Sequence, residues 1–117
     1  MSGKRGDRAA PPRRPEGWLV RFATSEAAKG WEELCRDAPS NTWEAWVILS
    51  ERPTNPERPE RQHRLRGEFS TRVIRGRVFD QWQYEATSGG RVWYCPDQAQ
   101  RVVWLTLAGT RHPKITD

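Results

Sequence analysis

The sequence has 117 residues, of which 35% are hydrophobic and 30% are charged, and its formal net charge is +5. This length suits one small domain. No apolar run approaches a membrane span and the beginning of the sequence has no signal-peptide core, so we expect a cytoplasmic protein without a membrane partner. The two cysteines, Cys35 and Cys95, fit no metal-binding spacing. They could pair as a disulfide, but buried thiols are expected.

The positive charge is concentrated in two segments. Residues 1–17 have a net charge of +3. Residues 52–77 contain eight arginines, no lysine and three glutamates, a net charge of +5. Arginine suits planar, bidentate recognition of phosphate. The alternative is a solvated loop that its charge keeps soluble, and a run of charge alone does not separate the two.

The N-terminal part of the chain predicts a tail followed by a strand. Residues 1–16 are rich in Gly, Pro, Ala and Arg, which indicates a disordered basic tail, and we place the folded domain at residues 17–117. Residues 17–23 alternate in a way typical of a strand. The partner of this strand is expected far along the chain, among the later strands.

Two helices are expected next, joined as an antiparallel hairpin. Thr24 or Ser25 should cap the first, over residues 26–37. Its expected apolar side consists of Ala27, Ala28, Trp31, Leu34 and Cys35. Ser40 or Asn41 should cap the second, which ends near residue 52. Its expected apolar side consists of Trp43, Trp46, Val47 and Leu49.

The second half of the sequence predicts a three-stranded antiparallel meander over residues 78–107. Runs rich in Val, Trp, Tyr and Thr are separated by Gly89-Gly90 and by a segment that begins with Pro96. Trp82 and Tyr84 should face the core, and the opposite face should be a polar working surface. Between the helices and the meander we expect a loop, with residues 68–77 either a basic loop or a short strand. The fold class is therefore α+β, in the order strand, helical hairpin and β-meander.

This order resembles the RelE/ParE superfamily, the toxins of bacterial type II toxin–antitoxin pairs. The resemblance covers residues 18–114 and rests on the helical hairpin, the His-Arg-Leu-Arg-Gly segment from His63, the Gly-Arg-Val-Trp-Tyr segment from Gly90, and a valine-rich last strand ending in Arg111-His112. It implies an acidic antitoxin as partner and two alternative activities. RelE-like and YoeB-like members cleave mRNA, usually on the ribosome, whereas ParE-like members bind DNA gyrase and have no nuclease site.

Metal-free RNA cleavage needs a base, an acid and cations that stabilise the phosphorane, with no cofactor. Arg91 matches the family's phosphate-contacting arginine. His63 and His112 are the candidates for proton transfer. The candidate phosphate contacts are Arg66, Arg111, Lys114 and Arg64. Glu85 is a further acid–base candidate, although a solvated carboxylate is the simpler reading, and Tyr94 is expected in the core.

The sequence departs from the RelE pattern at two places. The strand positions of the RelE lysines hold Trp82 and Tyr84, and no tyrosine follows Leu107. The histidines would then have to take over proton transfer, as in YoeB-like members. Three hypotheses remain open: an mRNA-cleaving toxin, a ParE-like inhibitor of DNA gyrase, and a basic RNA-binding module without catalysis.

Overall fold

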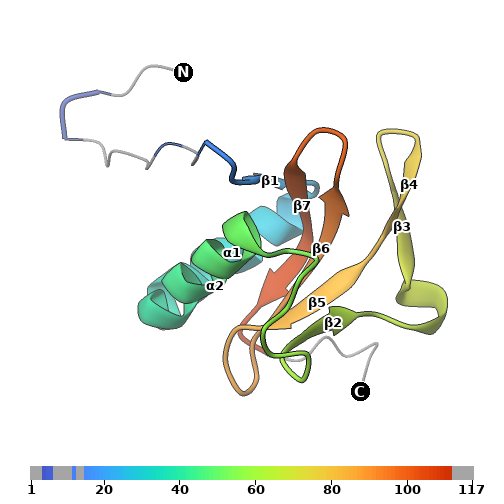
Figure 1. Ribbon diagram of the computed structural model, residues 1–117. Coiled ribbons are helices and arrows are strands. Elements are labelled where there is room, and N and C mark those ends of the chain that lie inside the picture. Colours follow the sequence, from blue (N-terminus) through green and yellow to red (C-terminus); the bar gives the residue numbers. More distant parts are fainter. Residues whose placement is uncertain (1–3, 7–11, 13–14, 112–117) are drawn as a thin grey trace.

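The computed structural model describes residues 4–6, 12 and 15–111. Two helices, α1 (Ser25–Asp37) and α2 (Pro39–Glu51), cover one face of a five-stranded sheet (Figure 1). The sheet strands are β1 (Leu19–Phe22), β2 (Gln62–Arg64), β5 (Trp82–Glu85), β6 (Arg91–Asp97) and β7 (Val102–Gly109). The other elements are the 3-10 helix η1 (Gly67–Phe69) and the hairpin strands β3 (Thr71–Ile74) and β4 (Arg77–Asp80). The predicted α+β class is confirmed.

The strand order is β1-β7-β6-β5-β2. Strands β5, β6 and β7 form the predicted antiparallel meander. The first strand finds its partner in the meander, as predicted, and lies parallel to β7 with Leu19 opposite Val102. None of the helices in the described part of the chain is long and apolar enough to cross a membrane.

Helix α1 packs closely on β7. Thr24 is its N-cap, and the Thr24 hydroxyl accepts a hydrogen bond of 2.9 Å from the Ala27 amide. Gly30 is buried at the contact, where an added Cβ would lie 1.7 Å from the carbonyl oxygen of Ala108. The expected burial of Cys35 was wrong, because the tight contact is centred on the side of the helix that carries Gly30 and Leu34, and Cys35 is exposed.

The side that helix α2 turns to the core was predicted in part, since Leu49 is buried as expected but Trp43 is not. The helix begins at Pro39, with Ala38 as N-cap, so neither Ser40 nor Asn41 caps it. Its buried residues are Thr42, Ala45, Leu49 and Ser50. Small side chains allow close packing, while the two tryptophans of α2 stack on each other at 5.3 Å. Trp43 is 59% exposed, so its predicted burial was wrong.

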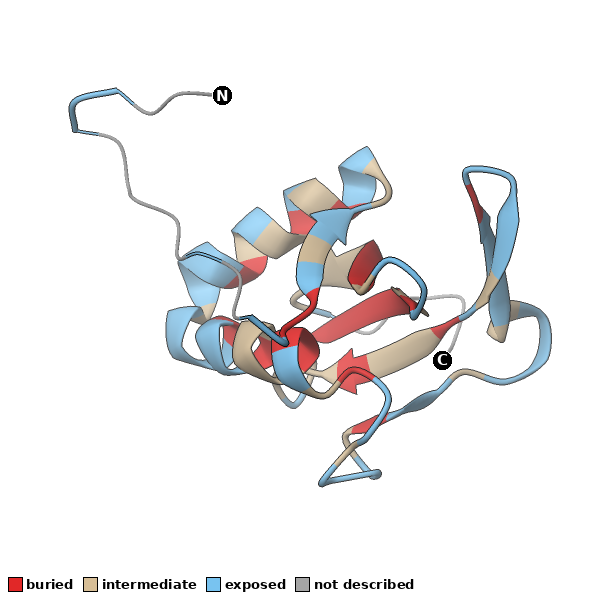
Figure 2. Cartoon of the chain, turned by 45° about the horizontal axis from the view of Figure 1, so that its top comes forward, coloured by how far each residue is buried: buried red, intermediate tan, exposed pale blue. Residues whose placement is uncertain are grey.

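The strand predicted over residues 78–87 is divided at Gln81. Residues before it pair with β3 and residues after it pair with β2. Gln81 is buried and joins three segments: its side-chain amide donates to Phe69 O at 2.8 Å, its amide oxygen accepts from the Thr106 hydroxyl at 2.6 Å, and its backbone N–H donates to Ser70 O. The β3–β4 hairpin projects from this junction and is largely exposed (Figure 2).

The face of the sheet opposite the helices, called here the helix-free face, is more apolar than predicted. Ile74 of the hairpin packs there with Cys95, Val102 and Trp104 in a second small core. Phe79 is partly buried against it. Trp82 and Tyr84 belong to the helix-side core, as predicted, whereas the face expected to be polar also carries Trp93, Cys95 and Trp104.

Candidate functional site

The polar part of the helix-free face lies toward β2. Residues paired across a sheet share a face, so His63, Gln83 and Trp93 form one row across β2, β5 and β6. Trp93 Nε1 donates to Gln83 Oε1 at 2.9 Å. Glu85 and Arg91 form the next row on the same face.

His63 is exposed, and its geometry suits proton transfer. The imidazole Nδ1 lies 3.1 Å from the carbonyl oxygen of Arg64. In the tautomer with hydrogen on Nδ1, this nitrogen donates to that carbonyl and Nε2 keeps its lone pair. A neutral imidazole held in this way can accept a proton from a bound molecule.

Arg91 is turned inward, away from solvent. Its side chain is 7% exposed, and Nη1 donates to the carbonyls of Thr87 at 3.0 Å, Ser88 at 3.3 Å and Gly90 at 3.0 Å. Nη2 lies 3.9 Å from the carboxylate of Glu85. The guanidinium group therefore holds the β5–β6 turn together, and a phosphate contact would require it to leave these carbonyls.

The predicted phosphate contacts lie in different places. Arg64 shares a face with Trp82 and so lies on the helix side of β2, where it forms a 2.9 Å ion pair with Asp80. Arg66 and Arg111 are exposed. His112 and Lys114 lie outside the described residues. Within the described ranges, no group of three or more His, Cys, Asp or Glu side chains is arranged to hold a metal ion.

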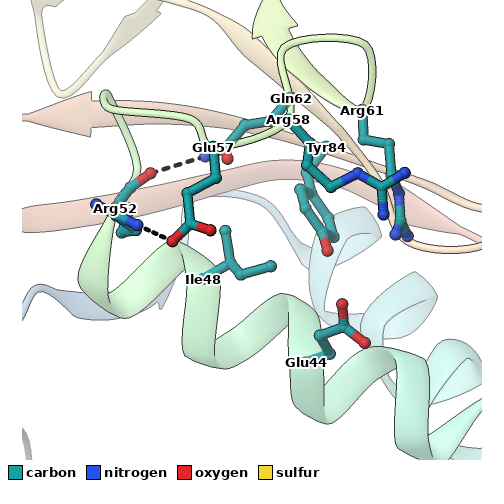
Figure 3. Close-up of a pocket in the computed structure, with 8 residues that line it drawn as sticks. All are labelled: Glu44, Ile48, Arg52, Glu57, Arg58, Arg61, Gln62 and Tyr84. Atoms are coloured by element: carbon teal, nitrogen blue, oxygen red, sulfur yellow. Dashed lines mark hydrogen bonds and ion pairs between the residues drawn. The ribbon is translucent and has the colours of Figure 1, made fainter.

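A pocket on the helix side lies between α2 and the loop that leads into β2 (Figure 3). Arg52 forms an ion pair with Glu57, and Arg58 forms one with Glu60. Arg61 lies over the ring of Tyr84, 5.7 Å from its centroid. Burial raises the pKa of Tyr84. Since acidic partners accompany two of its arginines, this pocket is a weak candidate for a phosphate site.

Sequence reasoning missed a second basic cluster, at the β1 side of the helix-free face. It comprises Arg21, Arg72 and Arg75 around Trp104. A two-residue Arg75-Gly76 turn between two Val-containing runs was a usable hairpin signal. It was weak because the preferred first residue of such a turn is Asn, Asp or Gly.

No family model matches the sequence, and no curated protein matches it. Among solved structures, the chain is similar to a chain in the crystal structure of the archaeal RelE–RelB complex from Pyrococcus horikoshii. The two share 16% identity with a TM-score of 0.54, and the match covers 79% of this chain and 92% of the other. At this identity the likeness concerns the fold, and the protein has a RelE-like fold.

Proposed function

We propose that this protein is the toxin of a toxin–antitoxin pair and that it cleaves messenger RNA on the helix-free face without a metal ion. The RelE-like fold supports the toxin assignment. The observation that carries the nuclease assignment is the exposed His63 on the same face as Glu85 and Arg91. Cleavage should be tested both on free messenger RNA and on messenger RNA bound to the ribosome.

The proposed chemistry divides among a few side chains. One histidine, His63 or His112, removes the proton from the ribose 2′-hydroxyl, and the 2′-oxygen attacks the adjacent phosphorus. The other histidine protonates the departing 5′-oxygen, which leaves a cyclic phosphate. Arg111 and Lys114, beside His112 in the sequence, neutralise the phosphorane. In this proposal Arg91 positions the turn and Glu85.

One observation favours a second candidate function. The guanidinium of Arg91 is engaged by three backbone carbonyls and lies near a carboxylate, so it is not presented to a substrate. A ParE-like toxin, which acts by binding DNA gyrase, needs no such presentation. Growth arrest without RNA cleavage would support this second candidate.

The test expresses the protein without a partner, follows growth and maps new RNA 5′ ends. His63→Gln keeps a polar side chain at an exposed strand position, so the fold should be retained. If His63 moves a proton, cleavage should fall by roughly 10²–10⁴-fold. His63→Gln with wild-type cleavage, in folded protein, would remove His63 from the mechanism.

A matched control is available on the same strand. Arg64→Gln removes a charge from the helix side of β2 and breaks the exposed pair with Asp80. Exposed ion pairs contribute about 0–1 kcal/mol to stability. This variant should therefore stay folded and cleave RNA at close to the wild-type rate.

A further inference from the structure

A cleft of about 220 Å³ lies at the β1 side of the helix-free face. The residues at the end of β1 and Trp104 of β7 line one side, and the turn end of the β3–β4 hairpin, with Arg72 and Arg75, lines the other. Within the described part of the chain, no acidic residue lines this cleft. Its charge is therefore positive.

Two guanidinium groups are held against Trp104. The guanidinium carbon of Arg21 lies 5.0 Å from the ring centroid, and that of Arg75 lies 4.8 Å from it. Trp104 is only 4% exposed, so it supports the arginines and does not offer a surface for stacking. A guanidinium group restrained in this way loses less conformational freedom when it binds phosphate.

As far as the structure describes the chain, the arginines around Trp104 lack carboxylate partners, unlike two arginines of the pocket beside Tyr84. Arg52 and Arg58 in that pocket have carboxylate partners. Among the described residues, none of Arg21, Arg72 and Arg75 forms an ion pair with a carboxylate. Neighbouring cations without acidic partners repel one another, and an anionic ligand would relieve that repulsion.

The backbone at Arg75 is a second, independent observation. Arg75 has φ +52° and Gly76 has φ +79°, so both residues of the turn are in the left-handed region. Such a turn favours Asn or Gly at the first position. Arginine there is strained, and strained residues cluster at functional sites. In this chain the strained residue is one that reaches Trp104.

We propose that this cleft binds the phosphate backbone of single-stranded RNA, with Arg72 and Arg75 of its lining on successive phosphates and Arg21, beside Trp104, adding positive charge next to it. Several cations along one cleft suit the successive phosphates of a flexible single strand. The choice of RNA rests on the proposed function, but binding in the cleft does not require cleavage.

The test measures the affinity of the full chain for a short fluorescein-labelled RNA whose 2′-hydroxyls are all methylated, so that it cannot be cleaved. The variant is the double substitution Arg72→Gln with Arg75→Asn. Asn suits the left-handed turn, so the hairpin should form at least as well as in wild type. By fluorescence anisotropy we expect affinity to fall about tenfold and the log–log salt slope to decrease by about 1.4, which corresponds to two lost phosphate contacts.

The control is Lys29→Gln with Arg36→Gln, which removes the same charge from the exposed side of α1. It should lower affinity far less than the cleft variant. The proposal would be overturned if the cleft variant and wild type bound RNA with equal affinity and thermal unfolding curves showed that both were folded. Poly-glutamate, as a stand-in for an acidic protein, is measured in the same way. A cleft variant that still binds the RNA but no longer binds poly-glutamate would also overturn the proposal, since the cleft would then be a site for acidic protein. If the wild type binds RNA through the cleft but cleaves no RNA, the result supports the binding site and contradicts the proposed nuclease activity.

Discussion

Arg91 illustrates what a single residue can and cannot reveal from its position in the sequence. The Gly89-Gly90 pair predicts a turn, and Arg91 does open the next strand. Nothing in the sequence indicates that its guanidinium folds back onto the carbonyls of the same turn. Substitution of Arg91 by Ala would remove these bonds along with any role in chemistry, so His63 is the sharper test of the site.

The two cysteines differ in environment, and this difference predicts a pH dependence of stability. Burial raises the pKa of the Cys95 thiol from 9.0 to about 12. Above pH 9 the unfolded chain ionises this thiol while the folded chain retains the proton. The free energy of unfolding should therefore be unaffected by this group below pH 9 and fall as the pH rises toward 12, by up to about 1.4 kcal/mol per pH unit.

Urea unfolding at several values between pH 7 and pH 10 measures this slope. Cys95→Ala should be less stable at neutral pH because it leaves a cavity, but its stability should depend less on alkaline pH. Cys35→Ser provides the control, since Cys35 is exposed. An unchanged alkaline slope in Cys95→Ala would show that another group is responsible. Burial also raises the pKa of Tyr94, which acts in the same direction at higher pH.

At the scale of elements, the two helices, the meander strands and the core side of Trp82 and Tyr84 were predictable from the sequence, but β2 and the buried side of α2 were not. Helix α2 is apolar on more than one side, so periodicity could not choose between its tryptophans and the smaller Ala45 and Thr42. Close approach to the sheet selected the small residues. The separation of β4 from β5 depends on Gln81, whose three bonds join segments that are distant in sequence.

The contact between α1 and β7 gives a prediction at the same scale. Gly30→Ala would place a methyl group 1.7 Å from the Ala108 carbonyl oxygen, which the helix can avoid only by moving off the sheet. Ala favours helix over Gly by about 1 kcal/mol, but overpacking costs about 1–3 kcal/mol and backbone is less able to yield than a side chain. We expect a net loss of stability in chemical denaturation. Lys29→Ala, at the exposed neighbouring position, should change stability by no more than about 0.5 kcal/mol.

At the scale of the whole molecule, the α+β class and the meander followed from composition and periodicity. Less of the candidate site could be predicted from the sequence, because the site depends on which strands are neighbours in the sheet. Arg21 and Arg75 are 54 positions apart in the numbering, yet both lie against Trp104. The parallel pairing of β1 with β7, together with the packing of Ile74 of the hairpin on the sheet, brings them together.

The net charge of +5 predicts the nature of the protein partner. If the protein is a toxin, co-expression with the acidic product of an adjacent reading frame should yield a stable complex. Opposite charge should make association faster at low ionic strength and slower as salt is added. Co-purification followed by binding kinetics at two salt concentrations checks this. Recovery of only the free protein at low salt would contradict the partner assignment.

The parallel pairing of β1 with β7 has a consequence for synthesis. Leu19 is made 83 positions before its partner Val102. At 5–20 residues per second, β1 waits roughly 4–17 s for the strand that will hold it. During that time its exposed Leu19 and Phe22 belong to no sheet. Until β7 has been translated, which requires almost all of the described sequence, neither β1 nor β6 can pair with it. A protein that binds the nascent chain during translation would meet it in that state.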